Sequence, residues 1–184
     1  MLSLKIIDES KLHPHKYFSR DMLAPAKLWY VLLSLALALI LNFIPSQSFS
    51  LSARPDFAAL VILFWSINQP QRMGMSIAFC IGLMMDVHNA GILGHHALAY
   101  CAIVYIASVF RRRLRIFDLM QQAPQVGLIL LIMQGLLVLI ALLNGSNLPD
   151  WTFFLASLTG AIVWPLIAFI LSIPLRPRPD SETI

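Results

Sequence analysis

Six runs of apolar residues, separated by short polar stretches, divide most of the chain. They cover residues 28–44, 57–68, 73–85, 97–110, 126–143 and 153–173. A helix needs about 20 apolar residues to cross a bilayer, and about 17 is near the lower limit. The second, third and fourth runs approach that length only with their semi-polar flanks, at 54–56, 86–88 and 93–96. The pattern predicts an all-α membrane protein, a six-transmembrane-helix bundle whose short helices pack mainly against protein.

The composition agrees with this prediction. Hydrophobic residues make up 59% of the 184 residues and charged residues only 12%, whereas soluble domains carry about 25% charged residues. The surplus of apolar surface requires a solvent other than water. The net charge of +4 is not a nucleic-acid signal, because the basic residues sit in short clusters between apolar runs.

The basic residues predict an orientation for the six helices. With the N-terminus inside, segments 1–27, 69–72, 111–125 and 174–184 hold 12 of the 13 Lys and Arg residues, and Arg54 is the one outside. Such a bias marks the cytoplasmic side of a membrane protein. We therefore expect a multi-pass membrane protein with a cytoplasmic tail at 1–27, a six-span domain at 28–173 and a second cytoplasmic tail at 174–184.

The stretch between the third and fourth runs, "GLMMDVHNAGILGHHALAY", gathers the residue types that bind metals or relay protons. They are Asp86, His88, His95 and His96. A zinc site needs three or four converging ligands, but adjacent histidines point in different directions on a helix, and no H-E-x-x-H spacing occurs. A structural or interface role for Asp86 is favoured, with a proton or substrate role as the alternative, and the histidines have no assigned role.

Glycines in the same stretch predict its backbone. Gly82 falls within a predicted helix, where glycine permits close helix approach, and Gly91 and Gly94 bracket a loop, where glycine permits positive φ. The spacing D-x-x-x-x-G-x-x-G after Asp86 indicates a helix stop followed by compact re-entry into the next helix.

The stretch "ARPDFAAL" carries the one basic residue outside, Arg54. Pro55 suits a first helical turn, and Asp56 places negative charge at the positive N-terminal end of a helix. One interpretation is a capped helix start, with Arg54 reaching lipid phosphate. The other is a periplasmic contact, or an Arg54–Asp86 pair between the second and third helices.

Two further patterns belong to the predicted inner surface and to the last helix. The basic cluster in "FRRRLRIFD" suits attraction to anionic lipid, or a docking site for a cytoplasmic partner; it comprises Arg111, Arg112, Arg113 and Arg115. Trp164 and Pro165 lie within the sixth run, where the proline should kink the helix. No hydrolase, Walker or C-x-x-C motif occurs, so we expect no catalytic, metal or cofactor site and no enzyme activity.

The ordered blocks "RPDFAALVILFWSINQPQRMGMSIAFCIGLMMD", "GILGHHAL", a basic loop and "GAIVWPL" resemble the family of the bacterial rod shape-determining protein MreD, over about residues 28–173. The resemblance implies a non-enzymatic inner-membrane subunit of the elongasome that scaffolds peptidoglycan synthesis and cell-shape control. Implied partners are MreC and, in a larger complex, MreB, RodA and penicillin-binding protein 2. Nine residues carry over as structural or interface positions: Arg54, Pro55, Asp56, Gly82, Asp86, Gly91, Gly94, Trp164 and Pro165.

A six-span bundle also resembles the substrate-binding subunits of energy-coupling-factor transporters, which supplies an alternative function in vitamin-type transport. A transporter subunit needs a cavity lined by several polar groups, whereas a scaffold needs a partner surface on outer helix faces. Polar side chains within the runs, such as Asn42 and Gln134, are few, and this favours the scaffold.

Overall fold

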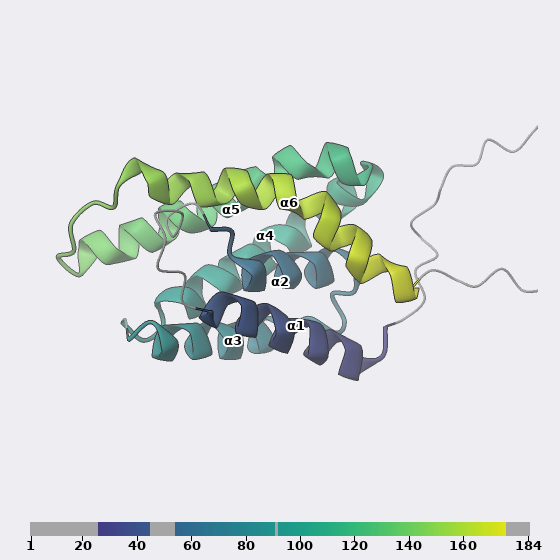
Figure 1. The fold of residues 1–184 in the computed structure, drawn as a ribbon, viewed down its shortest axis with the longest axis horizontal. Helices are drawn as coiled ribbons and strands as arrows, with labels where there is room; N and C mark the ends of the chain where they lie inside the picture. Colours follow the sequence, from purple (N-terminus) through teal and green to yellow (C-terminus); the bar gives the residue numbers. More distant parts are fainter. Residues whose placement is uncertain (1–25, 45–53, 91, 176–184) are drawn as a thin grey trace, which may run out of the picture.

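The computed structural model describes residues 26–44, 54–90 and 92–175, and these residues form six α-helices and no strand (Figure 1). The prediction of an all-α protein is confirmed. The helices are α1 (Leu28–Phe43), α2 (Phe57–Asn68), α3 (Met75–His88), α4 (His95–Ile116), α5 (Leu119–Leu143) and α6 (Leu155–Ser172), with two short 3₁₀ helices, η4 (Trp151–Phe154) and η5 (Ile173–Leu175), on either side of α6.

Helix α2 lies at the centre of the bundle. All residues from 58 to 67 are buried, which agrees with a sequence that has no polar face. It packs against α1, α4 and α6, and Figure 1 shows it between α1 and α3 on one side and α5 and α6 on the other. The indole Nε1–H of buried Trp65 donates to Ser34 Oγ of α1 at 2.9 Å, so this polar group has a partner inside the core.

The other helices pack as neighbouring pairs, α3 against α4 and α5 against α6. Small residues allow these close contacts. A Cβ added at Gly82 would lie 2.3 Å from Ala97 Cα, and one added at Gly127 of α5 would lie 2.9 Å from Ala161 Cβ of α6. The helices of each pair can approach this closely only because glycine has no side chain at these points.

Several helices extend beyond the apolar runs that predicted them. Helix α3 continues through Asp86 to His88, and α4 begins at His95 and continues through the arginine cluster to Ile116. Asp86 is therefore part of the last turn of α3 rather than a helix stop. Hydropathy ends a predicted span at the first charged residues, but backbone hydrogen bonding continues the helix wherever side chains can reach water or partners.

Helix lengths support fewer membrane crossings than the apolar runs do. In the described part of the chain two segments, Leu119–Leu143 and Trp151–Leu175, are long and apolar enough to cross a membrane. The apolar helices α1, α2 and α3 have 16, 12 and 14 residues, below the usual length of about 20. Large apolar side chains are nevertheless exposed along most of the bundle, including Leu37 on α1, Met84 on α3 and Ile162 on α6.

Candidate functional site

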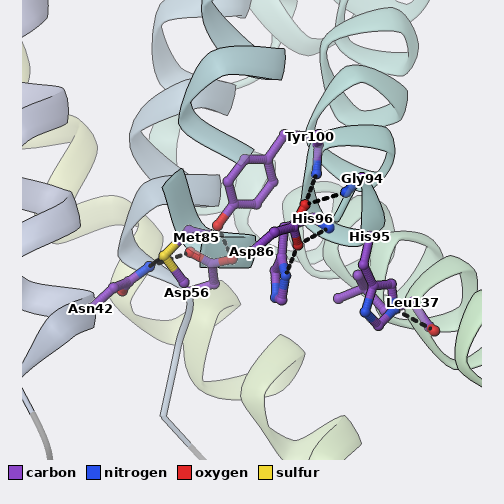
Figure 2. Close-up of polar contacts among 10 residues, drawn as sticks. Asn42, Asp56, Met85, Asp86, Gly94, His95, His96, Tyr100 and Leu137 are labelled. Carbon is purple, nitrogen blue, oxygen red and sulfur yellow. Dashed lines mark hydrogen bonds and ion pairs between the residues drawn. The ribbon is translucent and has the colours of Figure 1, made fainter. Parts of the chain in front are cut away.

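The carboxylate of Asp86 caps the N-terminus of α4 (Figure 2). Oδ2 accepts hydrogen bonds from the backbone N–H groups of Gly94 at 2.8 Å and Ala97 at 3.4 Å, and Oδ1 accepts from the N–H of His96 at 2.7 Å. The first N–H groups of a helix lack partners within it and carry partial positive charge. Gly94, at the cap position, has no side chain to fill this role, so α3 supplies the capping group. Asp86 is 1% exposed.

The three histidines of this stretch contact three different partners. His96 Nδ1 lies 2.8 Å from Asp86 Oδ1 and donates to it when that nitrogen carries the proton. The His95 Nε2–H donates to the Leu137 carbonyl of α5 at 2.8 Å. The His88 ring stacks on Phe43 of α1, with ring centroids 4.0 Å apart. The imidazoles therefore join helices instead of converging on one point.

A second carboxylate, that of Asp56, joins three helices. Oδ1 accepts from the Ala59 N–H in the first turn of α2 at 3.0 Å and from Asn42 Nδ2 of α1 at 2.7 Å. Oδ2 accepts from the Tyr100 hydroxyl of α4 at 2.7 Å. Asn42 Oδ1 in turn accepts from the Phe57 N–H at 3.0 Å. Asp56 and Asn42 therefore share the capping of α2, and Figure 2 places this group beside Asp86.

Arg54 caps the C-terminal end of α1. Its Nη1 donates to the Ile44 carbonyl at 2.6 Å, and its Nη2 donates to the Leu41 carbonyl. The last carbonyls of a helix have no partner within it and carry partial negative charge, which favours a cation there. The Arg54–Asp86 pair, one of the interpretations of the sequence, is absent from the described residues, because each group is occupied at a different helix end.

The remaining residues of this end have distinct positions. Asp56 is the cap residue and α2 begins at Phe57, so Pro55 lies one residue before the cap rather than in the first turn, close to Gly160 of α6. Gly94 has φ +97, a conformation that side chains other than glycine rarely adopt. Gly91 lies outside the described residues. We call this region, defined by Asp56 and Asp86, the carboxylate end of the bundle.

Trp164 and Pro165 lie away from the carboxylate end, within α6. Trp164 is 1% exposed, and its ring lies 6.5 Å from that of Phe64 in the central helix. Pro165 is inside the helix, and Figure 1 shows α6 changing direction along its length. The two residues therefore shape the contact between α6 and α2.

The arginine cluster lies at the opposite end, which we call the arginine end and define by residues 111–115. The Arg111 Nε–H donates to the Ile67 carbonyl at the end of α2, at 3.1 Å. Arg111 and Arg115 are partly buried, whereas Arg112 and Arg113 are exposed. In the sequence the four arginines form one cluster, but in the structure they form two pairs that differ in burial.

The polar groups of the carboxylate end join helices to one another. In the described part of the chain, no three His, Cys, Asp or Glu side chains are placed to hold a metal ion, and both carboxylates accept hydrogen bonds from neighbouring helices. Sequence reasoning missed the pairing of Asn42 and Tyr100 with Asp56. The available signal was the small number of polar side chains in these two apolar runs, because such a group needs a partner when it is buried.

Two open grooves, each of about 430 Å³, lie along α1 and α3. One runs between the helices past Leu35 and Ile81, and the other is bounded by Phe43 and His88 at the carboxylate end; Met84 lines both. Their lining is almost entirely apolar. Such grooves lack the convergent polar groups of a small-molecule site.

Comparison with known proteins identifies the family. Residues 26–173 match the family described as rod shape-determining protein MreD. The rod shape-determining protein MreD of Haemophilus influenzae is 25% identical over 144 residues, which cover 78% of this chain and 89% of that protein. No solved structure matches the chain. The family match extends over all six helices, and the chain therefore belongs to the MreD family of rod shape-determining membrane proteins.

Proposed function

We propose that this chain is a non-enzymatic subunit of the cell-elongation complex in the bacterial inner membrane, where it scaffolds peptidoglycan synthesis. The observation that carries the proposal is the family match over residues 26–173, because it includes all six α-helices. The partners we propose are MreC and, in a larger assembly, MreB, RodA and penicillin-binding protein 2. The family match gives no support to the vitamin-transporter alternative.

We further propose that all six helices cross the membrane, with the carboxylate end toward the periplasm and both termini in the cytoplasm. The Tyr30 hydroxyl at the start of α1 donates to the Leu171 carbonyl at the end of α6, at 3.5 Å, which supports termini on one side. The distribution of Lys and Arg supports the cytoplasmic placement of that side. Because α2 is surrounded by other helices, its 12 residues need not match the thickness of lipid.

The polar residues of the carboxylate end act, in this proposal, by holding the partner surface in shape. Arg54, Asp56 and Asp86 each occupy the end of a helix in their own chain. A partner would then contact the outer faces that these caps position.

The proposed division is a cytoplasmic tail at 1–27, the membrane domain at 28–173 and a tail at 174–184.

Affinity purification of the tagged full-length chain from detergent-solubilised membranes, followed by mass spectrometry, tests this proposal. We expect recovery of MreC and of the peptidoglycan synthases, and rounding of cells when the chain is depleted. Normal rods after depletion, together with no recovery of MreC, would overturn the proposal. Co-purification of a tight small-molecule ligand would favour transport instead.

A further inference from the structure

The arginine end contains two guanidinium groups whose charge the described protein does not neutralise. Arg111 and Arg115 are four residues apart on α4, so they share one face of the helix, and both are partly buried. The ion pair in the described part of the chain is that between His96 and Asp86, at the other end of the bundle. The acidic residue closest in sequence, Asp118, is exposed at the cap position of α5.

Contacts of the two side chains leave donors without acceptors. The Nε–H of Arg111 donates to the Ile67 carbonyl, which anchors this guanidinium at the C-terminus of α2 and leaves its Nη groups without a described partner. Nε of Arg115 is buried and has no hydrogen-bond partner among the described residues. A buried donor on a cationic group is costly to leave unpaired, and because both side chains are only partly buried, an external anion can approach their guanidinium groups.

The surroundings indicate what kind of anion fits. Helix α5 begins a few residues after Arg115, and its first turn has no side-chain cap, so its N–H groups add partial positive charge. Large apolar side chains lie exposed beside the arginines: Phe110 is 50%, Ile116 80% and Met120 75% exposed. A phosphate beside hydrocarbon satisfies both features, since guanidinium groups bind phosphate oxygens in pairs.

We propose that Arg111 and Arg115 form a phosphate-binding site at the end of α4, distinct from the exposed pair Arg112 and Arg113. The phosphate of an anionic lipid headgroup and a soluble phosphate share this chemistry, and the exposed apolar side chains favour the lipid. The exposed arginines contribute only general attraction to an anionic surface. This inference concerns a ligand of the chain itself and holds whether or not the chain assembles with MreC.

Native mass spectrometry of the purified full-length chain, with added phosphatidylglycerol in a neutral detergent, tests the site. Two double variants remove the same charge: Arg111→Gln with Arg115→Gln, and the matched control Arg112→Gln with Arg113→Gln. We expect the first to lower phosphatidylglycerol retention by roughly tenfold or more, since each arginine contact contributes to binding an anionic lipid. The control should retain nearly all of it. Equal loss in both variants would overturn the proposal.

Separate arms identify the source of the phosphate. Lipid retention that added inorganic phosphate does not displace assigns the site to a lipid, whereas thermal stabilisation by inorganic phosphate alone assigns it to a soluble ligand. If the wild-type chain shows neither lipid retention nor stabilisation by phosphate, the proposal is overturned. Because Arg111 also holds the end of α2, the folding of the double variant is checked by circular dichroism. If the double variant does not fold, the single variant Arg115→Gln is compared with the wild-type chain instead.

Discussion

At the scale of single residues, the polar groups of the apolar bundle complete the ends of helices. Asp86 caps α4 from the neighbouring helix, Asp56 caps α2, and Arg54 caps α1. In a bilayer, water is not available to satisfy the free N–H and C=O groups of a buried helix end. Ionisable residues in such positions are costly to bury alone, and here each is paired with groups of opposite charge or polarity.

Asp86→Asn should lower the stability of the purified protein. The amide has one acceptor oxygen where the carboxylate has two, and its NH₂ group would face the N–H groups of α4. We expect a loss of about 1–3 kcal/mol for each buried donor left without a partner, measured as a lower midpoint of thermal unfolding in detergent. Asp118→Asn is the control, because Asp118 is exposed and makes no side-chain cap hydrogen bond.

The same variant separates two explanations of any effect on cell shape. A cap role predicts lower stability or lower protein level together with the shape defect. Cells that lose rod shape while Asp86→Asn keeps wild-type stability and abundance would contradict the cap role and favour a direct contact between Asp86 and another molecule.

Gly82→Ala should destabilise the contact between α3 and α4. The added Cβ would lie 2.3 Å from Ala97 Cα, and backbone atoms can yield only if the helices move apart. Overpacking of this kind costs about 1–3 kcal/mol, and the unfolding midpoint should fall accordingly. Gly135→Ala is the matched control, because nothing lies within 4 Å of its added Cβ; an equal fall in both variants would refute the close-contact explanation.

At the scale of helices, the carboxylate end joins elements that lie far apart in the sequence. Asn42 in α1, Asp56 at α2 and Tyr100 in α4 form one hydrogen-bonded group. Next to it, Asp86 joins α3 to α4, and the contact between His95 and Leu137 joins α4 to α5. Five helices are therefore held at one end by side chains, while apolar packing around α2 holds the middle.

A double-mutant cycle tests the coupling between α2 and α4. Asp56→Ala and Tyr100→Phe should each destabilise the protein, and their combined effect should be smaller than the sum. Contacting residues in one network usually show coupling of about 0.5–3 kcal/mol. The measurement is the free energy of unfolding in detergent of the two single variants and the double variant. Additive effects would mean that the hydrogen bond between these side chains contributes nothing to stability.

At the scale of the whole molecule, the outer surface is apolar and the charged groups lie at two ends. Exposed leucine, isoleucine and phenylalanine side chains lie along α1, α5 and α6, as a hydrocarbon solvent requires. The central helix is too short to span lipid alone but is enclosed by its neighbours. The arginines of α4 and the carboxylates of Asp56 and Asp86 mark opposite ends of this body.

The proposed orientation predicts the behaviour of reporter fusions. A reporter that works only in the periplasm should be inactive when fused after residue 184 and active when inserted between residues 144 and 150. The physical reason is the retention of Lys and Arg on the cytoplasmic side. A reporter that fluoresces only in the cytoplasm, placed at the same two positions, should give the opposite result. Strong periplasmic activity at the C-terminus would exclude an even number of crossings with the N-terminus inside.

The sequence by itself determined the all-helical class, the family and the number and order of the helices, but it placed the end of α4 and the start of α5 six and seven residues from where they lie. These follow from local patterns, since apolar runs, caps and glycines act on neighbouring residues along the chain. Asp56 as a helix cap also follows from its place before an apolar run. Helix ends beyond charged residues, as at Asp86 and Arg111, were not determined, because hydropathy does not limit backbone hydrogen bonding.

The tertiary structure alone decided which distant groups meet. Asp86 binds α4 rather than Arg54, Tyr100 reaches Asp56, and one arginine pair turns inward while the other stays exposed. These contacts depend on how helices pack in three dimensions, and no spacing within one helix specifies its neighbour. Of the residues that resembled a ligand cluster in the sequence, Asp86 and His96 meet, whereas His95 contacts Leu137 and His88 stacks on Phe43.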